Sequence, residues 1–182
     1  FMASTDEART GPRSWAFRAA AGALQAAGVA AEVRDGVLPP TGAVVAGAMV
    51  GAADFSWEAS GATMLPGAWC DHLTSYGGAM EPGAGQTPLT AWLRAGAAGA
   101  GGAVAEPFNI PLKFPSAFVH LHRVRGLSLV EAVHRTMSMP FQYLAVGDPL
   151  SRPWADREPL PAARKAVAGA ALHAPSDAVW GS

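Results

Sequence analysis

Three short apolar runs, separated by segments with helical signals, constrain the fold of this chain more than any other feature. They cover residues 43–50, 103–105 and 141–146. The first run shows no alternation of polar and apolar residues, which is typical of a strand buried on both faces of a parallel sheet. Strands that alternate with helices need crossover connections. The order therefore predicts an α/β fold, a three-layer sandwich with a mostly parallel sheet.

Helices are predicted where a capping residue or a first-turn proline opens a segment and a glycine or proline closes it. The clearest case is Ser128, which can form a capping box with Glu131. The glycines from Gly99 to Gly102 are expected to break the chain before the second apolar run. By these signals we expect helices over residues 14–27, 66–75, 87–95, 116–125, 128–137 and 161–172, and a short strand over 31–34.

The length of 182 residues suits one domain. Residues 1–13 are polar and are expected to form a flexible arm ahead of an α/β domain over 14–154. Residues 155–182 are expected to be a C-terminal tail with a short helix. The first dozen residues carry no apolar core of a signal peptide, so the sequence leaves the localisation open. The Met at position 2 fits either a leftover residue or a fragment of a longer protein.

The composition argues against several classes of protein. Half of the residues are hydrophobic and 15% are charged, which is too little charge for a disordered chain. The 13 Lys and Arg residues are matched by 14 Asp and Glu residues, so we expect no nucleic-acid partner. Glycine and proline cut every apolar stretch well below the ~20 residues of a membrane span. A single cysteine, Cys70, allows neither an internal disulfide nor a Cys-rich zinc site, and we expect no cofactor.

Several segments together resemble the C-terminal region of a bacterial family of uncharacterised proteins. Residues 66–78 read PGAWCDHLTSYGG, and residues 85–97 read GQTPLTAWLRAGA. The resemblance spans about residues 43–154, and it brings no established activity with it. The shorter segments that contribute are Glu106-Pro107, Lys113-Phe114-Pro115, Val146 to Leu150 and Arg152-Pro153.

This family is in turn distantly similar to the caspase and gingipain class of cysteine peptidases. Such a resemblance implies an α/β sandwich with a histidine at one strand end and a nucleophilic cysteine after the next strand. His72 would be that histidine, and the nucleophile would fall within residues 105–109. That segment contains no cysteine, and position 108 is Phe108. The resemblance therefore implies a caspase-like core that lacks its nucleophile.

Three neighbouring residues could carry chemistry in such a core. Asp71 beside His72 could fix the tautomer of the imidazole and raise its basicity, but sequence neighbours on a helix do not face each other. Cys70 is expected on the same helix, on a different side from His72, as a small buried hydrophobe. The alternative to catalysis is a surface Asp71 and a partly buried His72 bonded to backbone.

Other candidate residues lie where strands are expected to end. Glu106 and Asn109 follow the second apolar run, and a carboxylate there could bind a polar ligand or bond nearby backbone N–H groups. Asp148, in the turn after the third run, is expected to accept from backbone N–H groups two residues on. His120 and His122 are expected to diverge on a helix, which argues against a metal site.

These observations favour a non-catalytic binding or assembly module, a subunit or fragment of a larger protein, with a protein partner or a homo-oligomer. The alanine-rich composition supports this because alanine buries little area by itself. The alternative is a caspase- or gingipain-like hydrolase that uses His72 with Cys70 or with Glu106. That alternative requires His72 and one partner side chain within hydrogen-bond reach in a cleft.

Overall fold

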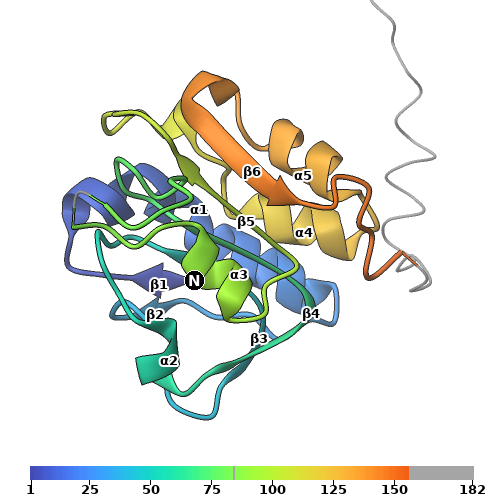
Figure 1. Ribbon diagram of the computed structural model, residues 1–182. Helices are drawn as coiled ribbons and strands as arrows, with labels where there is room; N and C mark the ends of the chain where they lie inside the picture. The colour runs from blue at the N-terminus through green and yellow to red at the C-terminus, as the bar shows by residue number, and fades with distance from the viewer. Residues whose placement is uncertain (84, 156–182) are drawn as a thin grey trace, which may run out of the picture.

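A four-stranded sheet forms the centre of the molecule in the computed structural model, which describes residues 1–83 and 85–155 (Figure 1). The strand order is β3-β4-β5-β6. The first three strands are parallel to one another, and β6 is antiparallel to β5. A mostly parallel sheet in an α/β protein is therefore confirmed. The strands are β3 (Val44–Val50), β4 (Thr63–His72), β5 (Gly99–Ala103) and β6 (Tyr143–Gly147).

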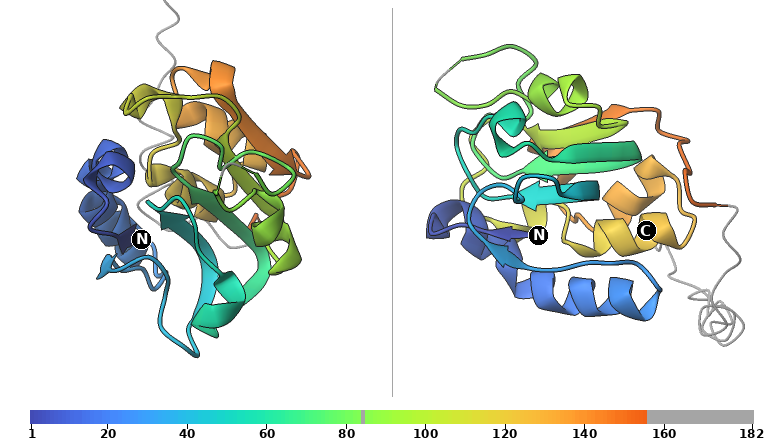
Figure 2. Two further views of the ribbon diagram at one scale, coloured as in Figure 1. Left: turned by 60° about the vertical axis from the view of Figure 1, so that its left-hand side comes forward. Right: turned by 90° about the horizontal axis from the view of Figure 1, so that it is seen from below.

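Helices lie on both faces of this sheet (Figure 2). On one face Phe17, Val119 and Val133 pack against Trp69 of the sheet. On the other face Trp57 and Trp92 belong to the core cluster that includes Cys70 and Val50. The helices of the first face are α1 (Glu7–Ala26), α4 (Phe118–Val124) and α5 (Leu129–Arg135), and those of the second are α2 (Trp57–Ser60) and α3 (Thr90–Arg94).

The chain begins in a strand and a long helix, so the expectation of a flexible arm over residues 1–13 is wrong. β1 (Met2–Ala3) pairs in parallel with β2 (Arg34–Asp35). Asp6 caps α1 by accepting from the backbone N–H of Arg9. Pro12 lies within the second turn of this helix, where its own ring replaces an N–H donor. The tail expected over residues 155–182 lies outside the described residues, apart from residue 155 itself.

The helix expected over residues 66–75 is instead the strand β4. Pro66 is compatible with this strand because the β3–β4 register shifts between Val45 and Gly47, so the ladder is interrupted where the proline lies. Residues two apart on a strand share a face. Cys70 and His72 therefore lie on one face of the sheet, and the prediction that a helix separates them is wrong.

The glycines expected to break the chain form the strand β5. A Cβ atom at Gly101 would lie 2.1 Å from the hydroxyl oxygen of Tyr143. One at Gly102 would lie 2.3 Å from the carbonyl carbon of Gly77. These close approaches explain why a strand with little β-propensity occupies the middle of the sheet: only glycine leaves room for its neighbours.

The helices expected over residues 87–95, 116–125 and 128–137 agree with α3, α4 and α5 to within three residues at each end. The helix expected over 14–27 is α1, which begins seven residues earlier, and the one expected over 161–172 lies outside the described residues. The capping box of α5 is present, since the backbone N–H of Ser128 donates to the Glu131 carboxylate at 2.9 Å. α4 is also helical as expected, so His120 and His122 diverge around it.

Candidate functional site

The carboxyl ends of β4 and β5 lie at the edge of the sheet where ligands of parallel sheets bind. A small cavity of about 80 Å³, here called the strand-end crevice, opens at this edge. Glu106 and Asn109 line it, as their position after β5 predicts. Arg9 reaches it from α1 and donates to the Thr74 hydroxyl at 3.0 Å. Arg9 also forms an ion pair with Asp6.

Glu106 holds the loop of the strand-end crevice in place. Its carboxylate accepts from the backbone N–H of Phe108 at 2.9 Å. A hydrogen bond from Ser75 and this backbone contact lower the pKa of Glu106. Phe108 has a φ of 54°, a left-handed conformation that is uncommon for a side chain of this size. Glu106 therefore bonds a nearby backbone N–H group, which is one of the two roles expected for it from the sequence.

Asp71 is fully buried and takes part in a brace between three elements. It forms an ion pair with the buried Arg13 of α1, and it accepts a hydrogen bond from the hydroxyl of Tyr143 in β6. Arg13 also donates to the carbonyl of Val50 at 2.9 Å. The expectation that Asp71 lies on the surface is therefore wrong. The buried carboxylate is thus paired with a guanidinium and a hydroxyl, which offsets the cost of taking its charge out of water.

His72 and Cys70 are buried with no exposed surface. The indole N–H of Trp92 donates to Nδ1 of His72 at 3.0 Å, and the ring of Phe55 meets the imidazole edge-on. Burial lowers the pKa of His72 to about 4 and raises the pKa of Cys70 to about 12. Within the described residues no hydrogen bond joins His72 to Cys70 or to Glu106, which lies in the strand-end crevice.

Because His72 is neutral in the folded protein, we expect acid to destabilise the fold. Its folded pKa of about 4 lies below the ordinary 6.5, so the unfolded chain binds the proton more readily between these values. The free energy of unfolding should therefore fall as the pH drops from 6.5 towards 4, by up to about 1.4 kcal/mol per pH unit from this group. Urea unfolding at several pH values measures the slope. A His72→Gln variant with the same slope would contradict this assignment.

Asp148 does not belong to the strand-end crevice. Because β6 is antiparallel to β5, Gly147 lies opposite Gly99, at the amino end of β5. The expectation that the turn after β6 joins the carboxyl ends of the other strands is therefore wrong. Its expected role as a turn former is confirmed, since the backbone N–H of Leu150 donates to Asp148 Oδ1 at 2.9 Å. Within residues 1–83 and 85–155 no three His, Cys, Asp or Glu side chains form a metal-binding group.

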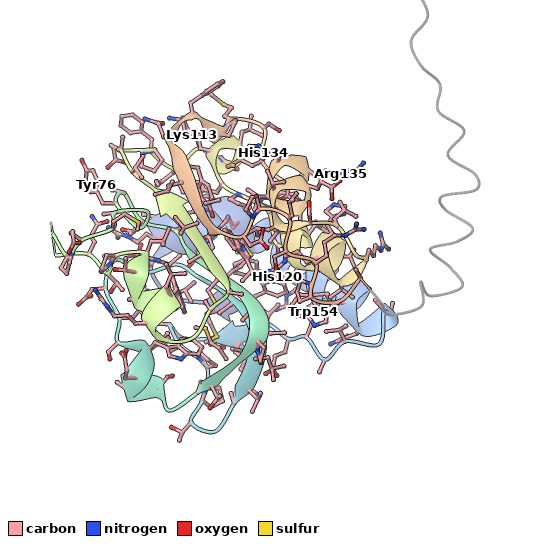
Figure 3. The ribbon with its side chains drawn as sticks, turned by 45° about the vertical axis from the view of Figure 1, so that its right-hand side comes forward. Tyr76, Lys113, His120, His134, Arg135 and Trp154 are labelled. Atoms are coloured by element: carbon pink, nitrogen blue, oxygen red, sulfur yellow. The ribbon has the colours of Figure 1, made fainter. Side chains whose placement is uncertain are left out.

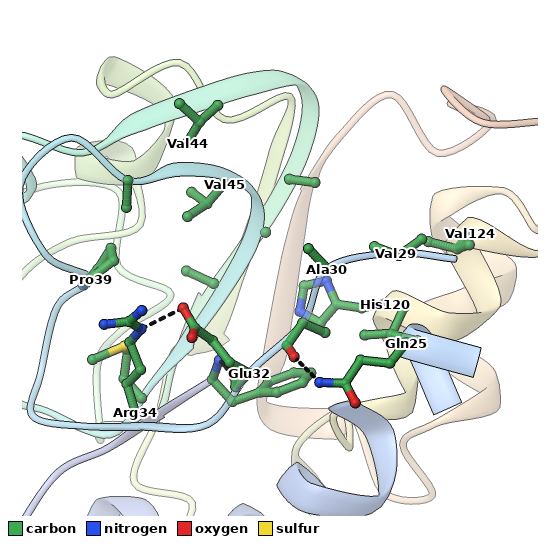
Figure 4. Close-up of a pocket in the computed structure, with 18 of the residues that line it drawn as sticks. Gln25, Val29, Ala30, Glu32, Arg34, Pro39, Val44, Val45, His120 and Val124 are labelled. Atoms are coloured by element: carbon green, nitrogen blue, oxygen red, sulfur yellow. Dashed lines mark hydrogen bonds and ion pairs between the residues drawn. The ribbon is translucent and has the colours of Figure 1, made fainter. Parts of the chain in front are cut away.

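The largest cavity among those described runs along the outer edge of β3 and has a volume of about 430 Å³ (Figure 4). We call it the β3-edge groove. One wall is β3, and the other is the segment over residues 29–34 that leads into β2. His120 of α4 and Trp154 border it from the helical layer (Figure 3). The remaining lining residues are Phe1, Met2, Leu24, Gln25, Pro39, Ala43 and Val124.

β1 lies beside the β3-edge groove, which Phe1 and Met2 help to line. β1 pairs with β2 on one side, and on the other the Ser4 hydroxyl donates to the carbonyl of Gly51, just after β3. In the described chain β3 pairs only with β4, so its outer backbone groups face the β3-edge groove without a strand partner.

His120 of α4 is one of the polar residues that line the β3-edge groove (Figure 4). Its Nε2 atom is buried and has no hydrogen-bond partner in the described part of the chain. Burial lowers the pKa of His120 to about 3, so the ring is neutral. Gly47 makes room for it, because a Cβ there would lie 2.4 Å from the ring. A neutral imidazole with a free nitrogen can bond a polar backbone group of an occupant.

Sequence reasoning missed the β3-edge groove. The unalternating run of β3 indicates a strand buried on both faces, but it carries no information on which edge stays unpaired. The available signal was Gly47 in the middle of the run, since a glycine inside a strand often marks a close approach. The second wall and His120 come from distant parts of the chain, and only the fold brings them together.

Comparisons with protein-family models, with curated proteins and with solved structures found no match for this chain. Across the described residues, none of the helices combines the length and apolar character that crossing a membrane requires.

Proposed function

We propose that this protein is a non-catalytic α/β binding or assembly module that accepts an extended polypeptide strand in the β3-edge groove. The caspase-like sandwich implied by the resemblance is part of this proposal, with the module as the core of a larger assembly. The observation that carries it is a strand edge, Val44 to Ala48, that has no strand partner within residues 1–83 and 85–155 and that lines a groove of about 430 Å³. Strand addition to such an edge gains affinity from main-chain hydrogen bonds.

The lining of the β3-edge groove supports a peptide rather than a charged small molecule. Its walls carry mostly small or branched apolar side chains, such as Val45, Ala46 and Ala30. Glu32 and Arg34, which also line it, form an ion pair with each other at its exposed rim. Apolar walls with satisfied charges suit the alternating side chains of an extended strand.

The burial and the contacts of the candidate catalytic residues support a non-catalytic role. A cysteine peptidase needs a thiolate and a base that reaches it. Cys70 and His72 are both buried. Burial raises the pKa of Cys70 and lowers that of His72, so both side chains favour their neutral forms. Glu106 is engaged with the backbone of its own loop. The segment over residues 105–109, where the resemblance implies a nucleophile, contains no cysteine, and its Phe108 has an exposed side chain.

Binding of a short strand peptide tests this function. The probe is the acetylated pentapeptide TVAVT, whose β-branched residues favour an extended conformation. We expect it to slow hydrogen exchange at least tenfold at saturation for those amides of residues 44–48 that face the groove, because it pairs with the β3 edge. Backbone NMR with and without the peptide measures this protection.

A matched pair of tryptophan substitutions locates the binding. Ala30→Trp fills the β3-edge groove, which Ala30 lines, and should abolish the protection. Ala59→Trp places the same side chain on the exposed surface of α2 and should leave binding unchanged. Protection that survives Ala30→Trp, or no protection in the unsubstituted protein, would overturn the proposed function.

A further inference from the structure

Arg123 of α4 is a buried cation for which the described part of the chain supplies no counter-charge. Only 1% of its surface is exposed. Its Nε and Nη1 atoms are buried and have no hydrogen-bond partner within residues 1–83 and 85–155, and none of the ion pairs found there includes it. Burial lowers the pKa of Arg123 to about 10, so the guanidinium is still charged at neutral pH. A buried charge without a partner is costly, so this group points to an anion from elsewhere.

Arg13 shows what a buried guanidinium in this fold otherwise has. It lies in the same helical layer and is as deeply buried, at 2% exposure. It forms an ion pair with Asp71 and donates to the carbonyl of Val50. Arg123 has neither kind of contact among the described residues, so burial alone does not account for it.

The indole ring of Trp154 holds the guanidinium of Arg123 in place. The ring centroid lies 5.2 Å from Cζ, which is a cation–π contact. The segment that carries Trp154 is itself fixed, because Arg152 donates from Nε to the carbonyl of Gly126 at 2.7 Å. An aromatic ring covers one face of a guanidinium but offers no acceptor to the N–H groups in its plane. The group is therefore oriented while its N–H donors stay available.

His120 adds a second polar group on the same side of α4 (Figure 3). It precedes Arg123 by three residues, and side chains at this spacing are neighbours on a helix. Its Nε2 atom is also buried and without a partner in the described part of the chain. The charge of Arg123 is one of the causes that lower the pKa of His120. A neutral imidazole carries one N–H, so with the proton on Nε2 it is a further donor to the same anion.

We propose that Arg123 is an oxyanion-binding residue, whose guanidinium, stacked on Trp154 and neighboured by His120, takes one carboxylate or phosphate group in its plane. The oxygens of these groups match guanidinium N–H donors in both geometry and charge. Two sources can supply the anion: a free ion, or a carboxylate of the chain itself. Asp156 and Glu158 follow Trp154 by two and four residues in the sequence. This inference does not depend on strand binding in the β3-edge groove.

The first test uses inorganic phosphate as the probe. Urea unfolding is measured in phosphate and in chloride at equal ionic strength. For a free ion, we expect saturating phosphate to raise the equilibrium constant for folding by at least about tenfold, because it binds the folded state. Arg123→Met should lose this effect, and Arg125→Met, at an exposed position two residues further on, should keep it. An equal gain in Arg123→Met would be the general action of phosphate on stability and would overturn the proposal.

The second test asks whether the chain supplies the anion. In that case the unsubstituted protein should not respond to phosphate, and the double variant Asp156→Asn with Glu158→Gln should be less stable. Phosphate should then restore the stability of this variant, because it takes the vacated guanidinium. Asp35→Asn with Glu81→Gln removes two carboxylates at exposed positions elsewhere and is the matched control, with no expected response. If the unsubstituted protein and the first double variant are equally stable and neither responds to phosphate, the proposal is wrong.

A third measurement reports on Arg123 directly and does not need a variant that folds. The NMR signal of its side-chain Nε–H should exchange with water at least tenfold more slowly when the anion is bound, because the proton is then held in a hydrogen bond. The comparison is with and without phosphate, in the unsubstituted protein and in the Asp156→Asn, Glu158→Gln variant. Stabilisation by phosphate that leaves this signal unchanged in both proteins would place the anion elsewhere and overturn the assignment.

Discussion

Arg13→Met is expected to lower the free energy of unfolding by about 3–5 kcal/mol, because it leaves the buried Asp71 without its counter-charge. Both side chains of this pair are almost fully buried. The Tyr143 hydroxyl would remain as a hydrogen-bond donor to Asp71, but a neutral donor does not replace a guanidinium. Chemical denaturation followed by tryptophan fluorescence measures the loss.

Two further variants show that the loss comes from the unpaired buried charge. Arg34→Met removes the arginine of the exposed pair with Glu32 and should have a far smaller effect, because solvent screens that pair. Adding Asp71→Leu to Arg13→Met should recover much of the stability, because replacing both buried partners removes the stranded carboxylate. A double variant less stable than Arg13→Met alone would refute this account.

Gly102→Ala is expected to have a comparable effect through steric overlap. The added Cβ would lie 2.3 Å from the carbonyl carbon and 2.6 Å from the carbonyl oxygen of Gly77, and 2.4 Å from the nitrogen of Gly78. Backbone atoms cannot turn away as a flexible side chain can, so β5 or the segment at Gly77 must move. We expect a loss of at least about 3 kcal/mol, the upper end for overpacking a core. Urea unfolding and the yield of folded protein measure it.

Gly22→Ala is the matched control for this substitution. Gly22 lies in α1, and a Cβ there would meet nothing within 4 Å. Alanine has the higher helix propensity, so we expect this variant to be more stable by about 0.5–1 kcal/mol. The opposite signs of the same change at two glycines would separate steric overlap from propensity. Equal effects would contradict the packing described for β5.

The sequence predicted the elements whose signals are local. The capping box of Ser128 and Glu131 marked the start of α5, and the apolar run from Ala43 marked β3. The prediction failed for β4, where Pro66 was read as the first turn of a helix. Tertiary pairing overrides that signal, because the register shift between β3 and β4 accommodates the proline. The prediction also failed for the glycine-rich β5, because the neighbours of this strand decide its structure rather than its β-propensity.

The candidate sites were predictable to the extent that they follow strand ends. Glu106 and Asn109 lie together at the strand-end crevice as expected. Asp148 does not, because its position depends on the direction of β6, and no local pattern gives the direction of a strand. The burial of Asp71 depends on Arg13 and Tyr143, which are far from it along the chain. Contacts of this kind are set by topology.

The brace at Asp71 also bears on the order in which the protein folds. Its partners are separated from it by 58 residues on one side and 72 on the other. A chain that emerges from the ribosome completes α1 and β4 long before Tyr143 is available. Until β6 joins the sheet, Asp71 lacks one of its two partners and the edge of β5 stays uncovered. Such non-local closure slows folding and exposes an unpaired strand to aggregation. The docking of β6, the last strand within the described residues, is therefore the step that commits the domain to its native state.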